Sequence, residues 1–316
     1  MSPRRWRDRG MTGNVTVDGW DGRGLPPVAR ARVERAAANG VRTSLLSADG
    51  LAGLEVAGFD AVGEVLGTTV MQIGWRGWGG CGWQPGWGGG SSFLGGPRAG
   101  EPTSMTRATR WSGYEPYAKA IRHGRDTALG RMRQEAAALG ADGVVGVRLT
   151  EERMEGQKHE FMALGTAVRS RGRQRPERTF TTDLAAQDLA KLLGAGWVPA
   201  GIIYGLSIAV RHDDWRTNSA LSPFAGNIEV SGYTDLITHV RATARNDFAG
   251  QVAALGADAA LMSGIQSRMW KLEVGENHTD HAASCIVTGN AIAKFKTGRK
   301  STTPSSLTIL PLRSMR

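Results

Sequence analysis

Apolar residues recur every three or four positions in two long stretches, Tyr117–Leu139 and the region around Ile237–Leu255. This spacing places the apolar residues on one face of a helix. A shift of 116 residues superposes the two stripes, and the paired positions are Ile121 and Ile237, Ala128 and Ala244, and Met132 and Phe248. The chain therefore contains two related helices, each amphipathic.

The same sequence signal follows both helices. Gly-Ala-Asp begins at Gly140 in the first copy and at Gly256 in the second. A glycine directly after the last apolar position is typical of the left-handed residue that ends a helix. The apolar runs 144–147 and 259–262 come next and predict short buried strands. We interpret the aspartates after the glycines as polar turn residues.

A second match lies upstream of the helices. A shift of 138 residues places Gly63 on Gly201 and Gly67 on Gly205. These glycines predict a β-bulge or a close backbone approach within a strand. We expect strands at 61–66 and 68–73, and one or two strands in the apolar stretch 197–210. Short helices should precede them at 51–56, capped by Ser47 or Asp49, and at 183–193.

The repeat predicts an α+β fold made of two tandem small domains, each with an antiparallel sheet and one main helix. One such unit has too few elements to cover both faces of its sheet, so a partner copy is expected. The predicted boundaries are a basic N-terminal arm 1–42, a first domain 43–169 with a Gly/Trp-rich insert 74–100, a basic linker 170–178, a second domain 179–296 and a tail 297–316.

Four motifs of the first copy occur in a specific order: GEVLG at 63–67, GY at 113–114, ALGADGVVGV at 138–147 and LGTAV at 164–168. In these motifs the chain resembles the YbjQ family, which carries a heavy-metal-binding label. The second copy keeps ALGADA and TGNAI but lacks VVGV. The resemblance implies a small α+β domain that assembles into ring-shaped oligomers, and it implies no established reaction.

The composition bears on where in the cell the protein is found. The two cysteines lie in different copies and cannot form a disulfide framework, which favours a reducing, cytoplasmic location. No apolar run follows the basic N-terminus, as a secretory signal would require. The stretch 197–210 is too short to span a bilayer.

The two strands after each long helix need a connection. We expect a turn around Gly156 in the first copy and a longer loop over 271–281 in the second.

The net charge of +10 is concentrated in three segments: the N-terminal arm, the linker and the start of the tail. Flexible basic segments attract phosphate without sequence preference, so nucleic acid is a possible partner. The simpler interpretation is a solvated linker and solvated tails. The arginines of the first long helix form a solvated face or, in an oligomer, line a pore or a subunit contact; they are Arg122, Arg125, Arg131 and Arg133.

The insert 74–100 concentrates four tryptophans among glycines: Trp75, Trp78, Trp83 and Trp87. Tryptophans in such a loop would stack on a ligand, or would form an oligomer or protein contact, because tryptophan is enriched at interface hot spots. The alternative is a loop folded back on its own domain. The glycines do not follow the spacing of a nucleotide-binding loop.

Among metal-ligating residues, the best candidate cluster is His278, His281 and Cys285, expected in a loop that runs into a strand. It lacks the helical spacing of the known two-histidine zinc motifs. No nucleophile motif or isolated carboxylate pair indicates an enzyme, and no cofactor beyond a divalent metal is suggested. We therefore expect a non-enzymatic, homo-oligomeric assembly or binding module, with heavy-metal binding and nucleic-acid binding as the alternatives.

Overall fold

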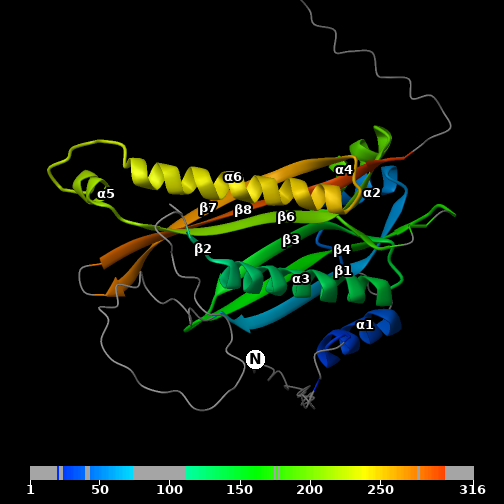
Figure 1. The fold of residues 1–316 in the computed structure, drawn as a ribbon. Helices are drawn as coiled ribbons and strands as arrows, with labels where there is room; N and C mark the ends of the chain where they lie inside the picture. Colours follow the sequence, from blue (N-terminus) through cyan, green and yellow to red (C-terminus); the bar gives the residue numbers. More distant parts are fainter. Residues whose placement is uncertain are drawn as a thin grey trace, which may run out of the picture.

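The computed structural model describes residues 20, 24–39, 43–73, 112–173, 175–176, 178–275 and 278–295. It contains two units built in the same order (Figure 1). The first unit comprises α2 (Ala48–Val56), β1 (Phe59–Gln72), α3 (Glu115–Ala138), β3 (Gly143–Arg153) and β4 (Lys158–Ser170). The second comprises α4 (Ala186–Gly194), β6 (Trp197–His212), α6 (Ser231–Ala254), β7 (Ala259–Gly275) and β8 (His278–Lys294). Four further elements are α1 (Pro27–Asn39), β2 (Ser112–Gly113), β5 (Phe180–Thr181) and α5 (Trp215–Ala220).

Each unit forms one four-stranded sheet, with strand orders β1-β4-β3-β5 and β2-β6-β8-β7. All pairings are antiparallel except the short parallel pair of β3 with β5. The α+β class predicted from the repeat is therefore confirmed. The predicted domain boundaries stay a prediction.

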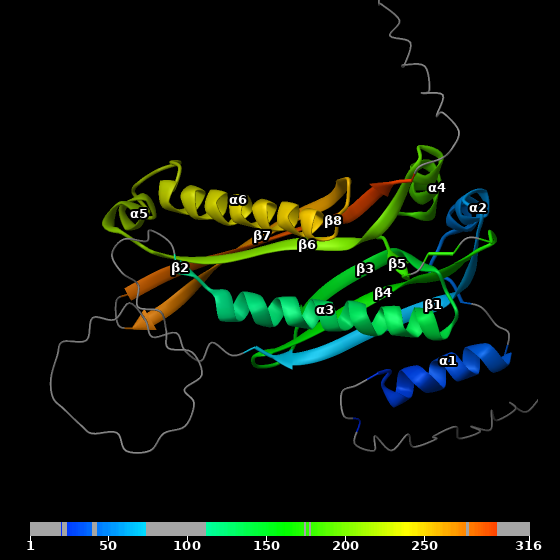
Figure 2. The ribbon, with the colours of Figure 1, turned by 45° about the vertical axis from the view of Figure 1, so that its right-hand side comes forward.

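The units stack in one direction. Helix α6 covers one face of the second sheet, the other face of that sheet lies on α3, and α3 covers the first sheet (Figures 1 and 2). A single buried cluster joins residues of α3, β3 and β4 to alternate residues of β6, among them Ile202, Leu206 and Ile208. Strand β6 is consequently buried on both faces.

Several local predictions are confirmed. Ser47 caps α2 by accepting a hydrogen bond from the Gly50 amide, 3.1 Å away. Gly140 and Gly256 follow α3 and α6 with φ of 69° and 64°. The carboxylate of Asp142 accepts a hydrogen bond from the Ser170 amide, which gives it the structural turn role expected.

Other predictions were wrong in detail. The region 59–72 is one strand and not two, because the backbone continues without a break at Gly67, where it passes close to α3. The predicted bulge is confirmed between Ala61 and Gly63. The expected loop 271–281 is mostly strand, since β7 and β8 stay paired out to Gly275 and His278. The short helix α5 in the second insert was not anticipated.

Two short strands cross between the units. Strand β2, just before α3 of the first unit, pairs with β6 of the second sheet. Strand β5, just before α4 of the second unit, pairs with β3 of the first sheet. The segment continues along β3, with the amides of Gly146 and Val147 donating to the carbonyls of Leu184 and Thr182.

Asn290 on β8 fixes the crossing segment to its own unit. Its side-chain oxygen accepts hydrogen bonds from the Thr182 hydroxyl at 2.9 Å and the Asp183 amide at 3.0 Å, and its amide nitrogen donates to the Asp183 carboxylate. Asn290 is fully buried, so these bonds form away from water.

Among the helices of the described residues, none combines the length and the apolar run that a membrane-spanning segment needs.

Gly205→Ala should destabilise the protein by about 1–3 kcal/mol, because the new methyl group would overlap the Ala244 carbonyl oxygen of α6. Gly250→Ala is the matched control: this exposed helical glycine has nothing within 4 Å of the added carbon. The control should be neutral or raise stability by about 0.5–1 kcal/mol. Urea unfolding measures both; equal shifts would contradict the close approach of strand and helix.

Asn290→Ala should lower the free energy of unfolding by about 1–3 kcal/mol, because buried polar groups of the crossing segment lose their partner. Hydrogen exchange of residues 180–184 should rise at the same time. Asn246→Ala, at an exposed position of α6, is the control. Unchanged exchange at 180–184 would show that Asn290 does not anchor the crossing.

Candidate functional site

The contact between the units is a polar and apolar joint made by α3 against the second sheet. The Arg122 guanidinium donates to the Asp247 carboxylate at 2.8 Å and to the Leu206 carbonyl at 3.3 Å. The Tyr204 hydroxyl donates to the Asp126 carboxylate at 2.7 Å. Burial, first of all, raises the pKa of Tyr204, so the phenol stays a neutral donor.

The arginines of α3 do not form a simple solvated face. Arg122 reaches the second unit, Arg133 donates to the Thr181 hydroxyl at 3.2 Å, and Arg125 is buried to 7% exposure. Arg131 bonds within its own unit, to the Thr68 carbonyl. Arg122, Arg125 and Arg133 lie at the contact between the two units of one chain, and the pore lining or subunit contact stays a prediction.

Because the units repeat, every surface of this joint has a counterpart elsewhere on the chain. The edge of β3 is covered by residues 180–184. Its counterpart is the edge of β7, which within the described residues has no strand beside it. Leu261 and Met262 on this edge are 40% and 49% exposed.

The crossing segment also has a counterpart, residues 43–45. The Leu45 amide donates to the Thr166 hydroxyl of β4, in the same place where the Asp183 amide donates to Asn290 of β8. Leu45 is 43% exposed. Leu51 of α2 is 45% exposed, whereas its counterpart Leu189 of α4 is fully buried. Residues 43–45 thus lie in the first unit as the crossing segment lies in the second, but the apolar side chains Leu45 and Leu51 are exposed to solvent.

Two apolar residues of the joint have charged counterparts in the repeat. Leu129 of α3 and Ile202 of β6 belong to the shared buried cluster. Their counterparts are Arg245, exposed on α6, and Glu64, half-buried on β1. Leu129 and Ile202, which are buried between the units, thus correspond in the repeat to Arg245 on the outer side of α6 and Glu64 on the outer side of β1, which carry opposite charges.

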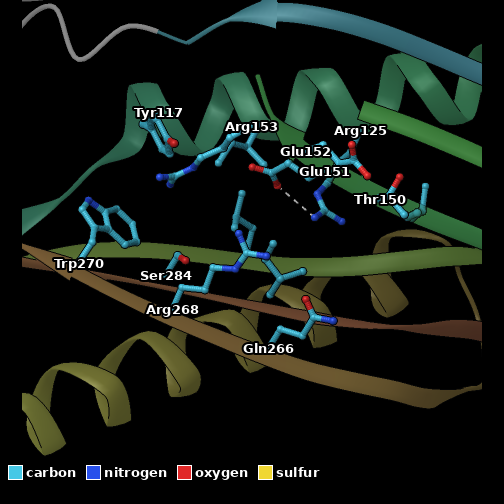
Figure 3. A pocket seen from close by; sticks show the side chains of 14 residues that line it. Tyr117, Arg125, Thr150, Glu151, Glu152, Arg153, Gln266, Arg268, Trp270 and Ser284 are labelled. Carbon is cyan, nitrogen blue, oxygen red and sulfur yellow. Dashed lines mark hydrogen bonds and ion pairs between the residues drawn. The ribbon is translucent and has the colours of Figure 1, made fainter. Parts of the chain in front are cut away.

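A pocket of about 300 Å³ lies between the units, bounded by α3 and β3 on one side and by β6, β7 and β8 on the other (Figure 3). Its lining combines arginines, glutamates and aromatic rings; the main members are Arg125, Arg153, Arg268, Glu151, Tyr117 and Trp270. Such a volume is at the lower end of small-molecule sites.

Charges in the pocket are partly paired. The Arg125 guanidinium lies 3.3 Å from the Glu151 carboxylate, which also lies 3.2 Å from Nδ1 of His159. The Arg153 guanidinium carbon lies 5.9 Å from the centre of the Trp270 ring. Burial, above all, raises the pKa of Tyr117, so this phenol is neutral too. The arrangement can hold an anionic group, and among the described residues that line it no hydroxyl is hydrogen-bonded to a base.

The predicted metal residues lie on β8. Cys285 is fully buried among apolar residues that face α6. His281 bonds through Nδ1 to the Asp213 carboxylate at 2.7 Å and contacts the Tyr233 hydroxyl. The side chain of His278 lies outside the described residues. Among the side chains that the structure describes, no group of three or more His, Cys, Asp or Glu is arranged to hold a metal ion. The metal site stays a prediction.

The four tryptophans predicted to bind a partner, Trp75, Trp78, Trp83 and Trp87, lie outside the described residues. So do most residues of the basic N-terminal arm and all of the tail 297–316.

Sequence reasoning did not find the pocket. Arg153 and Trp270 are distant in the sequence and are not repeat counterparts of each other. One available signal was that Trp270 and Arg268 stand in β7 at positions whose first-unit counterparts are Met154 and Glu152. This departure from the repeat marked the second unit's surface as different.

Comparison with known proteins finds a family that the first unit resembles. Residues 109–171, which include α3, β3 and β4, match the YbjQ family model described as "Putative heavy-metal-binding". The Encapsulin nanocompartment protein Rv1762c of Mycobacterium tuberculosis is 34% identical over 191 residues, covering 57% of this chain and 60% of that protein.

Shorter matches fall on UPF0145 proteins of Halorubrum lacusprofundi and Archaeoglobus fulgidus. Each is 47% identical, over 55 and 57 residues, covering 17% and 18% of this chain and 53% of each relative. The chain thus spans 53–60% of the length of these curated relatives. No solved structure matches the chain significantly. The resemblance seen in the sequence is confirmed: the first unit is YbjQ-like, and the second repeats its fold with a diverged sequence.

Proposed function

We propose that this protein is a non-enzymatic assembly module whose copies join head to tail. The observation that carries the proposal is the joint inside the chain. The first unit presents α3 and the β3 edge, and the second unit fills them with its sheet face and its crossing strand. Related surfaces recur at the two ends of the stack, where Arg32 of α1 bonds to the Leu66 carbonyl beside the tail surface.

The head surface would be the exposed side of α6 with the β7 edge; it includes Arg241, Arg245, Leu261, Ile265 and Met269. The tail surface would be the outer face of β1 and β4 with the segment before α2; it includes Leu45, Leu51, Glu64, Val70 and Glu160. A next copy would then lay its residues 43–45 along β7, as residues 180–184 lie along β3.

Such strand addition gives affinity through main-chain hydrogen bonds, and an exposed strand edge favours it. A head-to-tail contact is heterologous, so it closes into a ring when the rotation permits and otherwise extends as a filament. We favour a ring of an integral number of chains, because ring assembly is what the YbjQ resemblance implies.

The name of the Mycobacterium tuberculosis relative supports an assembly role, since it links that protein to an encapsulin nanocompartment. The insert with Trp75, Trp78, Trp83 and Trp87 would recur once per subunit. Repetition in an assembly raises weak affinities for a partner by avidity. We place this assembly in the cytoplasm.

The charge pair gives the sharpest test. Glu64→Arg and Arg245→Glu should each shift the protein to monomers in native mass spectrometry, because each puts like charges across the contact. The double variant Glu64→Arg/Arg245→Glu should recover oligomers. Arg216→Gln, on α5, is a control that should leave the assembly unchanged.

Two results would overturn the proposal. One is a wild-type protein that is monomeric at micromolar concentration and low salt. The other is an oligomer that persists in both single variants while circular dichroism shows them folded. A partial loss in each single variant that the double variant restores would support the contact and its register.

A further inference from the structure

We propose that the pocket between the units binds a small organic anion: a flat apolar group that carries a terminal phosphate or carboxylate. The pocket lies within one chain and uses no surface of the head-to-tail contact. The two proposals therefore stand or fall separately.

The first argument is a buried cation with spare donor capacity. Arg125 is 7% exposed, and one of its terminal nitrogens pairs with Glu151 at 3.3 Å. Its Nε is buried and has no hydrogen-bond partner among the described residues. An unsatisfied buried donor on a charged group is costly. An anion in the pocket would offset the charge of this guanidinium, whose carboxylate partner among the described residues is Glu151.

The second argument is the charge of the lining. Three arginines, Arg125, Arg153 and Arg268, face two glutamates, Glu151 and Glu152. Glu151 is shared between Arg125 and His159, so it compensates Arg125 only in part. Arg268 forms no ion pair within the part of the chain that the structure describes. Figure 3 shows Arg153 and Arg268 entering the same space from opposite units. An anion between them would offset their repulsion.

The third argument is the aromatic and apolar surface of the pocket beside these arginines. The Trp270 ring lies under the Arg153 guanidinium, and Tyr117 stands on the other side of the space (Figure 3). Ile286 and Leu206 extend the apolar surface, and both pack in the shared core cluster. Aromatic faces with few polar groups favour a flat apolar body, and the arginines fix the position of its charged end.

The ligand would touch both units, since Arg125 and Arg153 belong to the first, and Arg268 and Trp270 to the second. Binding would stabilise the folded pair of units by mass action, so the melting temperature should rise with ligand concentration. The proposal is one of binding only, because no nucleophile among the described lining residues is hydrogen-bonded to a base.

Phenyl phosphate and benzoate are the probes, and neutral benzyl alcohol tests whether the charge is needed. Titration calorimetry on the full chain should show saturable, one-to-one binding of at least one anion and none of benzyl alcohol. Binding of phenyl phosphate alone would identify a phosphate site, of benzoate alone a carboxylate site, and of both a general anion site. All three results support the proposal.

Arg268→Gln and Trp270→Leu should each weaken binding at least tenfold, because they remove the second unit's cation and its flat wall. Arg216→Gln removes an exposed arginine of α5 outside the pocket and should leave affinity unchanged. Thermal unfolding without ligand confirms that the variants fold.

Three outcomes overturn the proposal. The first is the absence of binding by either anion. The second is affinity that falls equally in Arg216→Gln and Arg268→Gln, which would mean general attraction to a basic chain. The third is a folded Arg268→Gln or Trp270→Leu variant that binds as the wild type does, since the site needs both walls.

Discussion

The whole structure depends on β6 being covered on both faces. Its odd-numbered side chains face α6, and its even-numbered ones, Ile202, Tyr204, Leu206 and Ile208, pack with α3 and the first sheet. Every residue from 201 to 211 is buried. A strand of this kind cannot be exposed on one side without a large loss of hydrophobic stabilisation. The two units are therefore one stack with a common core.

Much of this fold was predictable from spacing alone. The two helical stripes, the glycines that end the helices, and Gly67 and Gly205 under the helices follow from local rules that act within one repeat. The apolar stretch 197–210 also predicted one or two buried strands, and it forms the single strand β6. What covers its second face was not predictable, because Tyr204 and Arg122 become neighbours only through the packing of one unit on the other.

The candidate site was less predictable than the fold. The predicted metal residues were chosen because they are close in sequence; in the structure His281 bonds to Asp213 and Cys285 is enclosed beneath α6, and the metal site stays a prediction. The pocket instead gathers Arg125, Arg153 and Trp270 from three separate elements. Sites formed between units leave no local spacing pattern, so sequence reasoning finds their residues only as departures from the repeat.

The crossing strand β5 has a consequence for how such a chain can diversify. Because the linker ties the two units together, their joint forms at a high effective concentration and needs no affinity of its own. Its residues therefore need no charges to find their partners: Leu129 and Ile202 are apolar, whereas their counterparts Arg245 and Glu64 are charged. In the proposed head-to-tail assembly, the joint inside the chain would be permanent and the contact between copies would depend on ionic strength, a combination that identical single units cannot provide.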